Sequence, residues 1–140
     1  MRARDQRLLT EALGPELAAG ERLELLGQAN VSTASMHEKV GIAVATAVLS
    51  GGMMAATVTP SMLYLVLTDQ RLLLLRPAVT VKKSRVVASI PRQLLGLSGY
   101  KRGPLKVRFK LGVAGEPLVI RVEFIFAKAD GDRFAEALAS

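Results

Sequence analysis

The sequence predicts a mostly β (α+β) domain of about seven antiparallel strands, bent into a barrel and capped by a C-terminal helix. Three observations support this fold class. Tyr64 to Pro77 contains two short apolar runs separated by a polar break, which is typical of a β-hairpin. Leu105 to Leu111 alternates strictly between apolar and basic residues, as a half-buried strand does. Asp130 to Ala139 has a candidate N-cap, Asp130 or Asp132, and two large apolar residues four positions apart, which indicate a helix.

Length and composition indicate a single domain over residues 1–140, because a chain of this length can bury a core without disulfides or a metal. The chain has no cysteine, which excludes a disulfide, a thiolate zinc site and a cysteine nucleophile. Its first residues mix leucines with acidic residues and lack the apolar core of a secretory signal. We therefore expect a location on the cytoplasmic side.

The first part of the chain contains a short helix and one strand. Three leucines fall on one side of a helix over Asp5 to Leu13, and Gly14-Pro15 ends it. Residues 1–19 are therefore expected to form a helical extension. Glu21 to Val31 follows with an imperfect alternation and is expected to be the first strand.

An apolar insertion is expected between the first two strands, over residues 36–60. Val40 to Thr68 carries no formal charge, and Val40 to Pro60 lies outside the hairpin. A helix of about 20 residues would just cross the hydrocarbon core of a bilayer, but Gly51-Gly52 interrupts this segment and its alanines and threonines are weakly apolar. A buried or self-associating helical segment is therefore favoured over a membrane-inserted one. Its candidate contact residues are Ile42, Val44, Val48, Leu49, Met53 and Met54.

The hairpin and the segments after it are expected to complete one side of the sheet. The unbroken apolar run Leu72 to Leu75 predicts a hairpin that is covered on both faces or central in the sheet. Val79 to Val81 and Arg85 to Pro91 form one strand or two. Leu94 to Tyr100 is a further strand, in which two glycines mark a bulge or a tight bend.

Leu118 to Phe126 is expected to pair with the alternating strand across a glycine-containing turn. In that pairing Glu123 could lie opposite Lys106, and Arg121 near Arg108, so the second strand neutralises only part of the basic side. The expected core-facing residues of this strand are Leu118, Ile120, Val122, Phe124 and Phe126.

The net charge of +7 comes from the middle third of the chain. From Gln70 to Gly115 there are eleven Lys/Arg residues and no acid, whereas the segments on either side each have a net charge of −2. These bases predict a positive surface if their strands are neighbours in space; otherwise they are a solvated face that aids solubility. The candidate residues for an anionic surface are Lys82, Lys83, Arg85, Lys101, Arg102, Lys106, Arg108 and Lys110.

The hairpin also resembles a known family. Leu65-Val-Leu-Thr-Asp-Gln-Arg-Leu-Leu-Leu-Leu75 is similar to the signature hairpin of bacterial pleckstrin-homology-like (PH-like) domains and the related GRAM domains. Gly20-Glu21 looks like the Gly-Glu that often opens their first strand, and Asp132 to Leu138 looks like their closing helix. The resemblance implies a seven-stranded bent barrel with a C-terminal helix and a binding role. The family's basic phosphoinositide-binding loop is not carried over, because the corresponding segment here is uncharged.

Catalytic motifs are absent from the sequence. His37 is the only histidine, no second histidine follows it at the zinc-protease spacing, and no Gly-x-Ser-x-Gly elbow occurs. The glycines do not form a phosphate-binding loop. We therefore expect no enzymatic activity, no metal, no cofactor and no small-molecule substrate, and we interpret His37 as an ordinary polar residue.

Three functions remain. The preferred one is a non-catalytic module that self-associates as a homo-oligomer, or binds a protein partner, through the apolar insertion. The second is peripheral association of the basic residues with anionic lipid at the inner face of the membrane. The third, nucleic-acid binding, is disfavoured because Tyr100 and Phe109 are the only aromatic residues in the basic third, and Phe109 is expected to point inward.

Overall fold

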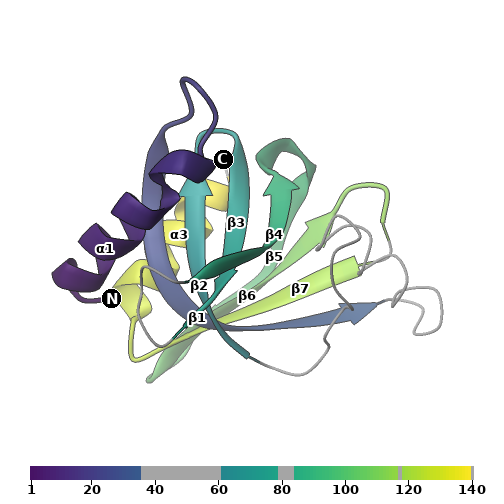
Figure 1. Cartoon of the computed structure of the whole chain (residues 1–140). Helices are drawn as coiled ribbons and strands as arrows, with labels where there is room; N and C mark the ends of the chain where they lie inside the picture. Colours follow the sequence, from purple (N-terminus) through teal and green to yellow (C-terminus); the bar gives the residue numbers. More distant parts are fainter. Residues whose placement is uncertain (36–60, 79–83, 117, 140) are drawn as a thin grey trace.

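The computed structural model describes residues 1–35, 61–78, 84–116 and 118–139, which form one seven-stranded antiparallel sheet with helices packed against it (Figure 1). The sheet order is β4-β3-β2-β1-β7-β6-β5. This confirms the mostly β architecture with a C-terminal helix. In chain order the elements are α1 (Ala3–Leu13), the 3-10 helix η1 (Gly14–Glu16), β1 (Leu23–Ser35), β2 (Ser61–Thr68), β3 (Arg71–Arg76), β4 (Arg85–Pro91), the 3-10 helix η3 (Arg92–Leu94), β5 (Leu95–Arg102), β6 (Lys106–Val113), β7 (Leu118–Ile125) and α3 (Lys128–Ala139).

Strand β1 joins the two halves of the sheet. Its residues Leu23 to Val31 pair with β2, and its residues Asn30 to Ser35 pair with β7. Both halves contribute to one main hydrophobic core, which includes residues of β2, β3, β6, β7 and α3. We call the side of the sheet that faces this core the inner face and the opposite side the outer face. Helix α3 covers the core from one side, where the Phe134 ring packs on Phe124 with centroids 5.3 Å apart.

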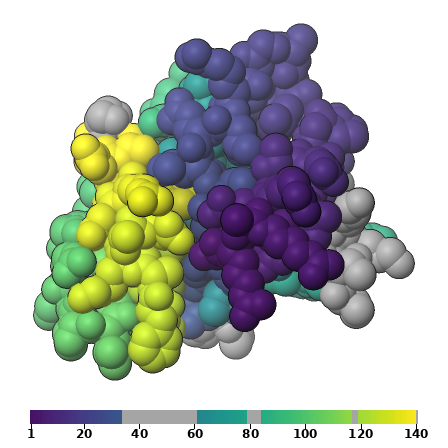
Figure 2. All heavy atoms as spheres, turned by 90° about the vertical axis from the view of Figure 1, so that its left-hand side faces the viewer, coloured from purple at the N-terminus to yellow at the C-terminus, as the bar shows by residue number. Residues whose placement is uncertain are grey.

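The hairpin β2–β3 is covered on both faces, as its unbroken leucine run predicted. Alternate residues such as Leu65 and Leu74 enter the main core. The residues between them pack on Leu9 and Leu13 of α1, which covers the outer face of this half. In the turned view of Figure 2 the N-terminal residues (purple) and α3 (yellow) lie side by side, and the N-terminal amine is 3.5 Å from a carboxylate oxygen of Asp130.

Two glycines allow α3 to approach the sheet closely. A Cβ atom on Gly131 would lie 2.8 Å from Cβ of Val107, and a Cβ atom on Gly27 of β1 would lie 2.9 Å from the Phe134 ring. Both distances are shorter than side chains tolerate without moving. The absence of a side chain at these two positions therefore sets how deeply α3 sits.

Element boundaries differ from the expectation at β1 and α3. β1 begins and ends later than the expected Glu21 to Val31, because Glu21 turns into a buried polar cluster and pairing with β7 extends the strand. The N-cap prediction for α3 is wrong, since the helix begins at Lys128. Asp130 lies in its first turn, and Asp132 accepts hydrogen bonds from β5 instead.

Phe126 and Leu105 are the two expected core residues that are exposed in the structure. The Phe126 side chain is 81% exposed, whereas Ile120, Val122 and Phe124 are buried as predicted. β7 ends at Ile125, and Phe126 has a positive φ of 57°. This left-handed conformation ends the strand alternation, so Phe126 points away from the core.

Several predicted segments lie outside the described residues. They include His37, the insertion over residues 36–60 and the possible strand at Val79 to Val81. The affected candidate contact residues are Ile42, Val44, Val48, Leu49, Met53, Met54, Lys82 and Lys83. Across the four described ranges, every helix is too short or too polar to span a bilayer.

The close approach at Gly131 predicts a loss of stability on substitution. Gly131→Ala should lower the free energy of unfolding by about 1 to 2 kcal/mol, although alanine favours a helix by about 1 kcal/mol over glycine. Urea denaturation followed by circular dichroism would measure this change. Gly96→Ala is the control, because a Cβ atom there meets nothing within 4 Å. A Gly131 variant as stable as the wild type would show that α3 does not depend on this contact.

Candidate functional site

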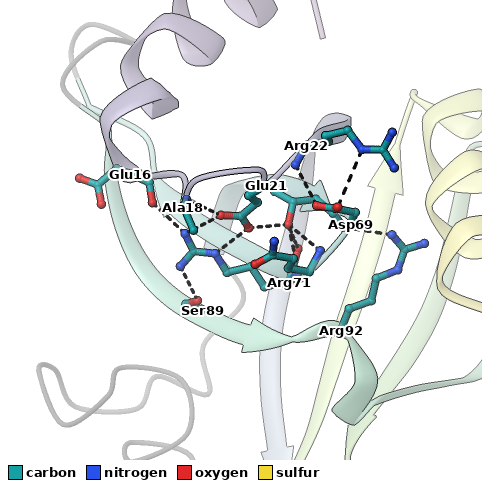
Figure 3. A network of polar contacts seen from close by, with 10 residues as sticks. Glu16, Ala18, Glu21, Arg22, Asp69, Arg71, Ser89 and Arg92 are labelled. Atoms are coloured by element: carbon teal, nitrogen blue, oxygen red, sulfur yellow. Dashed lines mark hydrogen bonds and ion pairs between the residues drawn. The ribbon is translucent and has the colours of Figure 1, made fainter.

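The most perturbed carboxylate in the described residues is Glu21, which lies just before β1 (Figure 3). Hydrogen bonds from Arg71 lower the pKa of Glu21 from its ordinary value of 4.5 to about 2, against the opposing effect of burial. Bonds from the Thr68 hydroxyl and the Ala18 amide contribute to the same lowering of the pKa, and the value of about 2 includes them. Perturbed groups of this kind mark functional sites in many proteins, so this cluster is a first candidate.

The geometry shows that each oxygen of the Glu21 carboxylate already accepts two hydrogen bonds from within the chain. Oε1 accepts bonds from the Ala18 amide at 2.9 Å and from Nη2 of Arg71 at 3.0 Å. Oε2 accepts bonds from Oγ1 of Thr68 at 2.6 Å and from Nε of Arg71 at 2.9 Å. Two further Arg71 donors, on Nη1 and Nη2, bond to Ser89 Oγ and to the Glu16 carbonyl. The cluster therefore holds the fold together.

The second candidate is the outer face of β5, β6 and β7. On β6 the buried residues Val107, Phe109 and Leu111 place the intervening bases on the outer side. Arg121 of β7 pairs with Lys110, and Lys101 of β5 pairs with Arg108. Five bases from three neighbouring strands thus share one surface, which we call the basic face: Lys101, Lys106, Arg108, Lys110 and Arg121.

Glu123 is the acidic residue that the register places among these bases, which leaves a net charge of +4. The predicted ion pair forms, with Nζ of Lys106 3.0 Å from Oε2 of Glu123. Directly opposite Glu123, however, is Arg108, and Arg121 lies opposite Lys110. The expected register therefore differs from the observed one by two residues. Apart from Lys106, the bases of this face have no ion-pair partner within the described ranges.

A shallow hollow of about 360 Å³ lies between these bases. Its polar lining is provided by Lys101, Arg108, Lys110, Arg121 and Glu123. Like charges side by side on neighbouring strands are unfavourable in isolation. A surface that keeps Lys110 opposite Arg121 is therefore suited to an anionic ligand that screens both.

A bulge at Gly99 decides which bases of β5 join the basic face. Gly99 has φ of 63°, and the register with β6 shifts between Ser98 and Lys101. The shift places Lys101 on the outer face and turns Arg102 toward α3. There, Nε of Arg102 is 3.1 Å from Asp132, and the Tyr100 hydroxyl donates to the same carboxylate at 2.6 Å. These two bonds lower the pKa of Asp132.

The structure therefore brings together four of the eight predicted anion-binding candidates: Lys101, Lys106, Arg108 and Lys110. Arg102 faces α3, and Arg85 lies on β4 at the opposite end of the strand order. Arg121 was missed as a candidate because it follows the basic third of the sequence. The alternation of β7 placed it on the outer side, but only the register shows that it faces Lys110.

Within residues 1–35, 61–78, 84–116 and 118–139, acidic and histidine side chains do not gather in groups of three that could hold an ion. What the basic face offers chemically is electrostatic attraction and hydrogen-bond donors for phosphate or carboxylate groups.

Comparisons with known proteins bear on the fold. No protein-family model and no curated protein matches this sequence. Among solved structures, the chain is similar to Vav1 inhibited by an allosteric inhibitor, with a TM-score of 0.61 and 12% identity over 98% of this chain and 34% of that chain. A second structure, described as showing a critical structural role for the PH and C1 domains of the Vav1 exchange factor, gives a TM-score of 0.54 and 14% identity. The match covers 98% of this chain and 33% of that chain. The Vps36 N-terminal PH domain gives a TM-score of 0.49 and 19% identity, covering 88% of this chain and 80% of that chain.

The chain thus spans about one third of the length of the Vav1 chains that it matches. At these identities the likeness concerns the fold alone. Together with the seven-stranded sheet and the C-terminal helix, it shows that the chain has a PH-like fold.

The Glu21 cluster predicts a large effect of one conservative substitution. Glu21→Gln should lower the free energy of unfolding at pH 7 by about 2 to 4 kcal/mol, because Arg71 loses its buried counter-charge. Glu24→Gln is the matched control: Glu24 pairs with Arg92 at the surface, and its loss should cost less than about 1 kcal/mol. Urea denaturation would measure both variants.

The same measurement repeated at lower pH tests the cause. The pKa of Glu21 is lower in the folded protein than the ordinary value, so its contribution is complete above about pH 4.5 and is lost as the pH falls toward 2. The stability difference between wild type and Glu21→Gln should therefore shrink over this window. A difference that stays constant down to pH 3 would contradict the ion-pair explanation.

Proposed function

We propose that this chain is a non-catalytic PH-like interaction module that binds anionic lipid surfaces through the basic face. The observation that carries the proposal is the group of four bases on β5, β6 and β7 without ion-pair partners in the described residues, arranged around one hollow. Such a surface attracts phosphate-bearing headgroups both by its summed field and by direct hydrogen bonds.

The magnitude is sufficient for reversible membrane association. Each base near an acidic lipid surface contributes about 1 kcal/mol. The net charge of +4 on the basic face therefore supports weak binding by itself, with a strong dependence on salt. The bases lie on one side of a sheet, which lets several of them reach the same membrane surface.

Nucleic acid is a less suitable partner. Binding of single strands relies on aromatic side chains on which bases stack. Phe109 is buried at 2% exposure, as predicted, and Tyr100 is engaged with Asp132 beside α3. On the described part of the chain, the basic face therefore offers charge but no stacking platform.

We also propose a relationship to bacterial PH-like and GRAM-like domains, with residues 1–140 as one such domain acting at the cytoplasmic side of a membrane. The support is the motif itself. Its residues Glu21, Thr68 and Arg71 are the three side chains that bond to one another in the buried cluster. This gives a physical reason for these residue types to occur together.

Self-association or binding of a protein partner, which the sequence favoured, is kept here as the second candidate function. It rests on the uncharged run from Val40 to Thr68 and on the candidate contact residues within 36–60. A homo-oligomer held by this segment is compatible with membrane binding through the basic face, because the two use different residues.

Vesicle sedimentation tests the basic face. Lys110→Glu combined with Arg121→Glu reverses one cross-strand pair of bases on this face. Binding to phosphatidylcholine vesicles that contain phosphatidylglycerol should weaken by at least about tenfold, since each reversed charge removes about 1 kcal/mol and adds repulsion. Wild-type binding should require the anionic lipid and decrease with salt.

The matched control is Arg76→Glu combined with Arg85→Glu, a cross-strand pair of exposed bases on β3 and β4. It makes the same change in net charge at the other edge of the sheet. If the control weakens binding as much as the Lys110 and Arg121 variant does, net charge and not the basic face determines binding. Wild-type protein that ignores anionic vesicles at low salt would refute the proposal.

The self-association candidate has its own test. Val44→Asp and Val48→Asp each place a charge in the apolar segment, so either should dissociate an oligomer by making its contact surface costly to bury. Sedimentation equilibrium of the wild type and both variants would measure the mass. If both variants keep the wild-type mass, an apolar interface at these residues is ruled out.

A further inference from the structure

Three apolar side chains are exposed together at one end of the sheet. Leu105 in the β5–β6 turn is 58% exposed, Ile125 at the end of β7 is 38% exposed, and Phe126 beyond it is 81% exposed. We call Leu105, Ile125 and Phe126 the apolar tip. Single exposed apolar residues are common on protein surfaces, whereas three close together are typical of an interaction site.

Backbone hydrogen bonds hold the apolar tip in place. The Phe126 amide donates to the Leu105 carbonyl at 2.9 Å, which ties the β7–α3 connection to the β5–β6 turn. Within that turn the Gly103 amide donates to the Lys106 carbonyl at 2.8 Å. The three apolar residues therefore belong to one fixed unit of structure.

The conformation of Phe126 makes its exposure a property of the fold. A φ of 57° is unfavourable for a bulky residue, and glycine or asparagine would occupy this position more easily. The chain nevertheless has phenylalanine there, with a side chain that makes no described contact with either hydrophobic cluster. The unfavourable backbone conformation and the exposure of this one aromatic residue indicate that its side chain contacts a partner outside the domain.

The apolar tip adjoins the basic face. A hollow of about 480 Å³ at the tip is lined by Pro104, Leu105 and Ile125 together with bases. Two of those bases, Lys101 and Arg108, also line the hollow on the basic face. Apolar and cationic surfaces are thus continuous, with the cations beside the apolar residues.

We propose that the apolar tip inserts into the interfacial region of an anionic bilayer while the basic face rests on the lipid phosphates. The proposal rests on the proposed function and adds the orientation of the module. Lys106 pairs with Ile125 at the open end of the β6–β7 hairpin, where the apolar tip lies. Ser35 at the end of β1 pairs with Leu118, at the end of β7 next to the β6–β7 turn. Figure 1 shows the β7–α3 connection and the end of β1 on opposite sides. The proposed membrane contact is therefore at the end of β7 that lies away from Ser35.

Charge favours a bilayer over a second copy of the chain. Two copies joined through their apolar tips would bring Lys101, Arg108 and their neighbours in each copy close to the same bases in the other. An anionic bilayer instead offers phosphates at the depth of the bases and hydrocarbon just below, as interfacial anchors require. Such an interface therefore complements both the charge of the bases and the apolar side chains beside them.

Single-tryptophan fluorescence tests this orientation, because the chain contains no tryptophan. Phe126→Trp places the only tryptophan at the tip, and Ala114→Trp places it at the exposed β6–β7 turn on the opposite end. With vesicles that contain phosphatidylglycerol, emission of Phe126→Trp should shift to the blue and be quenched by lipids brominated on their acyl chains. Emission of Ala114→Trp should not change.

A second variant measures the contribution of the tip to affinity. Phe126→Ser should weaken vesicle binding by about tenfold or more, and the factor should persist at high salt, because it reflects lost apolar transfer. Lys110→Glu with Arg121→Glu should lose affinity mainly at low salt. This contrast separates insertion from electrostatic attraction.

The outcomes distinguish the two proposals. If wild type and Phe126→Trp both sediment with anionic vesicles but the emission of Phe126→Trp does not shift, insertion is overturned and membrane binding through the basic face stands. If the wild type does not sediment, the proposed function fails, and insertion fails with it. A blue shift of Phe126→Trp that needs no vesicles and grows with protein concentration would show that a second copy covers the tip, which also overturns insertion.

Discussion

The ion pair between Glu21 and Arg71 is the interaction on which the rest of the structure depends. It connects residues 50 positions apart, and its bonds extend to η1 through the Glu16 carbonyl and to β4 through Ser89. A buried ion pair contributes little net stability when complete, but it is costly to leave half-made. Because a shift of the β2–β3 hairpin by one residue would separate Arg71 from Glu21 and move every leucine to the wrong face, the pair selects one register.

That register determines which parts of the sheet remain available for binding. With the hairpin fixed, one set of its apolar residues enters the main core and the other set requires α1 on the outside. The two halves of the sheet therefore differ: the outer face of β2 and β3 is covered by a helix, whereas β5, β6 and β7 carry bases there and no described helix covers them.

Local periodicity in the sequence was sufficient to predict most of the strands and the C-terminal helix. The alternation from Lys106 to Leu111 and the unbroken run from Leu72 to Leu75 correctly predicted a half-buried strand and a doubly covered hairpin. Leu105 was expected on the core side of that strand, but it precedes β6 and is exposed. Features that depend on long-range register were not predictable. The bulge at Gly99 reverses the faces of β5, which sends Arg102 to α3 and Lys101 to the basic face. The positive φ of Phe126 likewise ends an alternation that the sequence pattern continues. The roles proposed for residues 36–60 stay predictions, since these residues lie outside the described ranges.

The combination of cations and apolar side chains at one end of the sheet has a physical consequence beyond either feature alone. Electrostatic attraction acts over about 10 Å at moderate salt and, in the proposed membrane role, would bring the module to an anionic surface, but it is easily screened. Apolar burial acts only on contact and is insensitive to screening, so it prolongs the bound state. Placed together, they make binding selective for surfaces that are both anionic and penetrable.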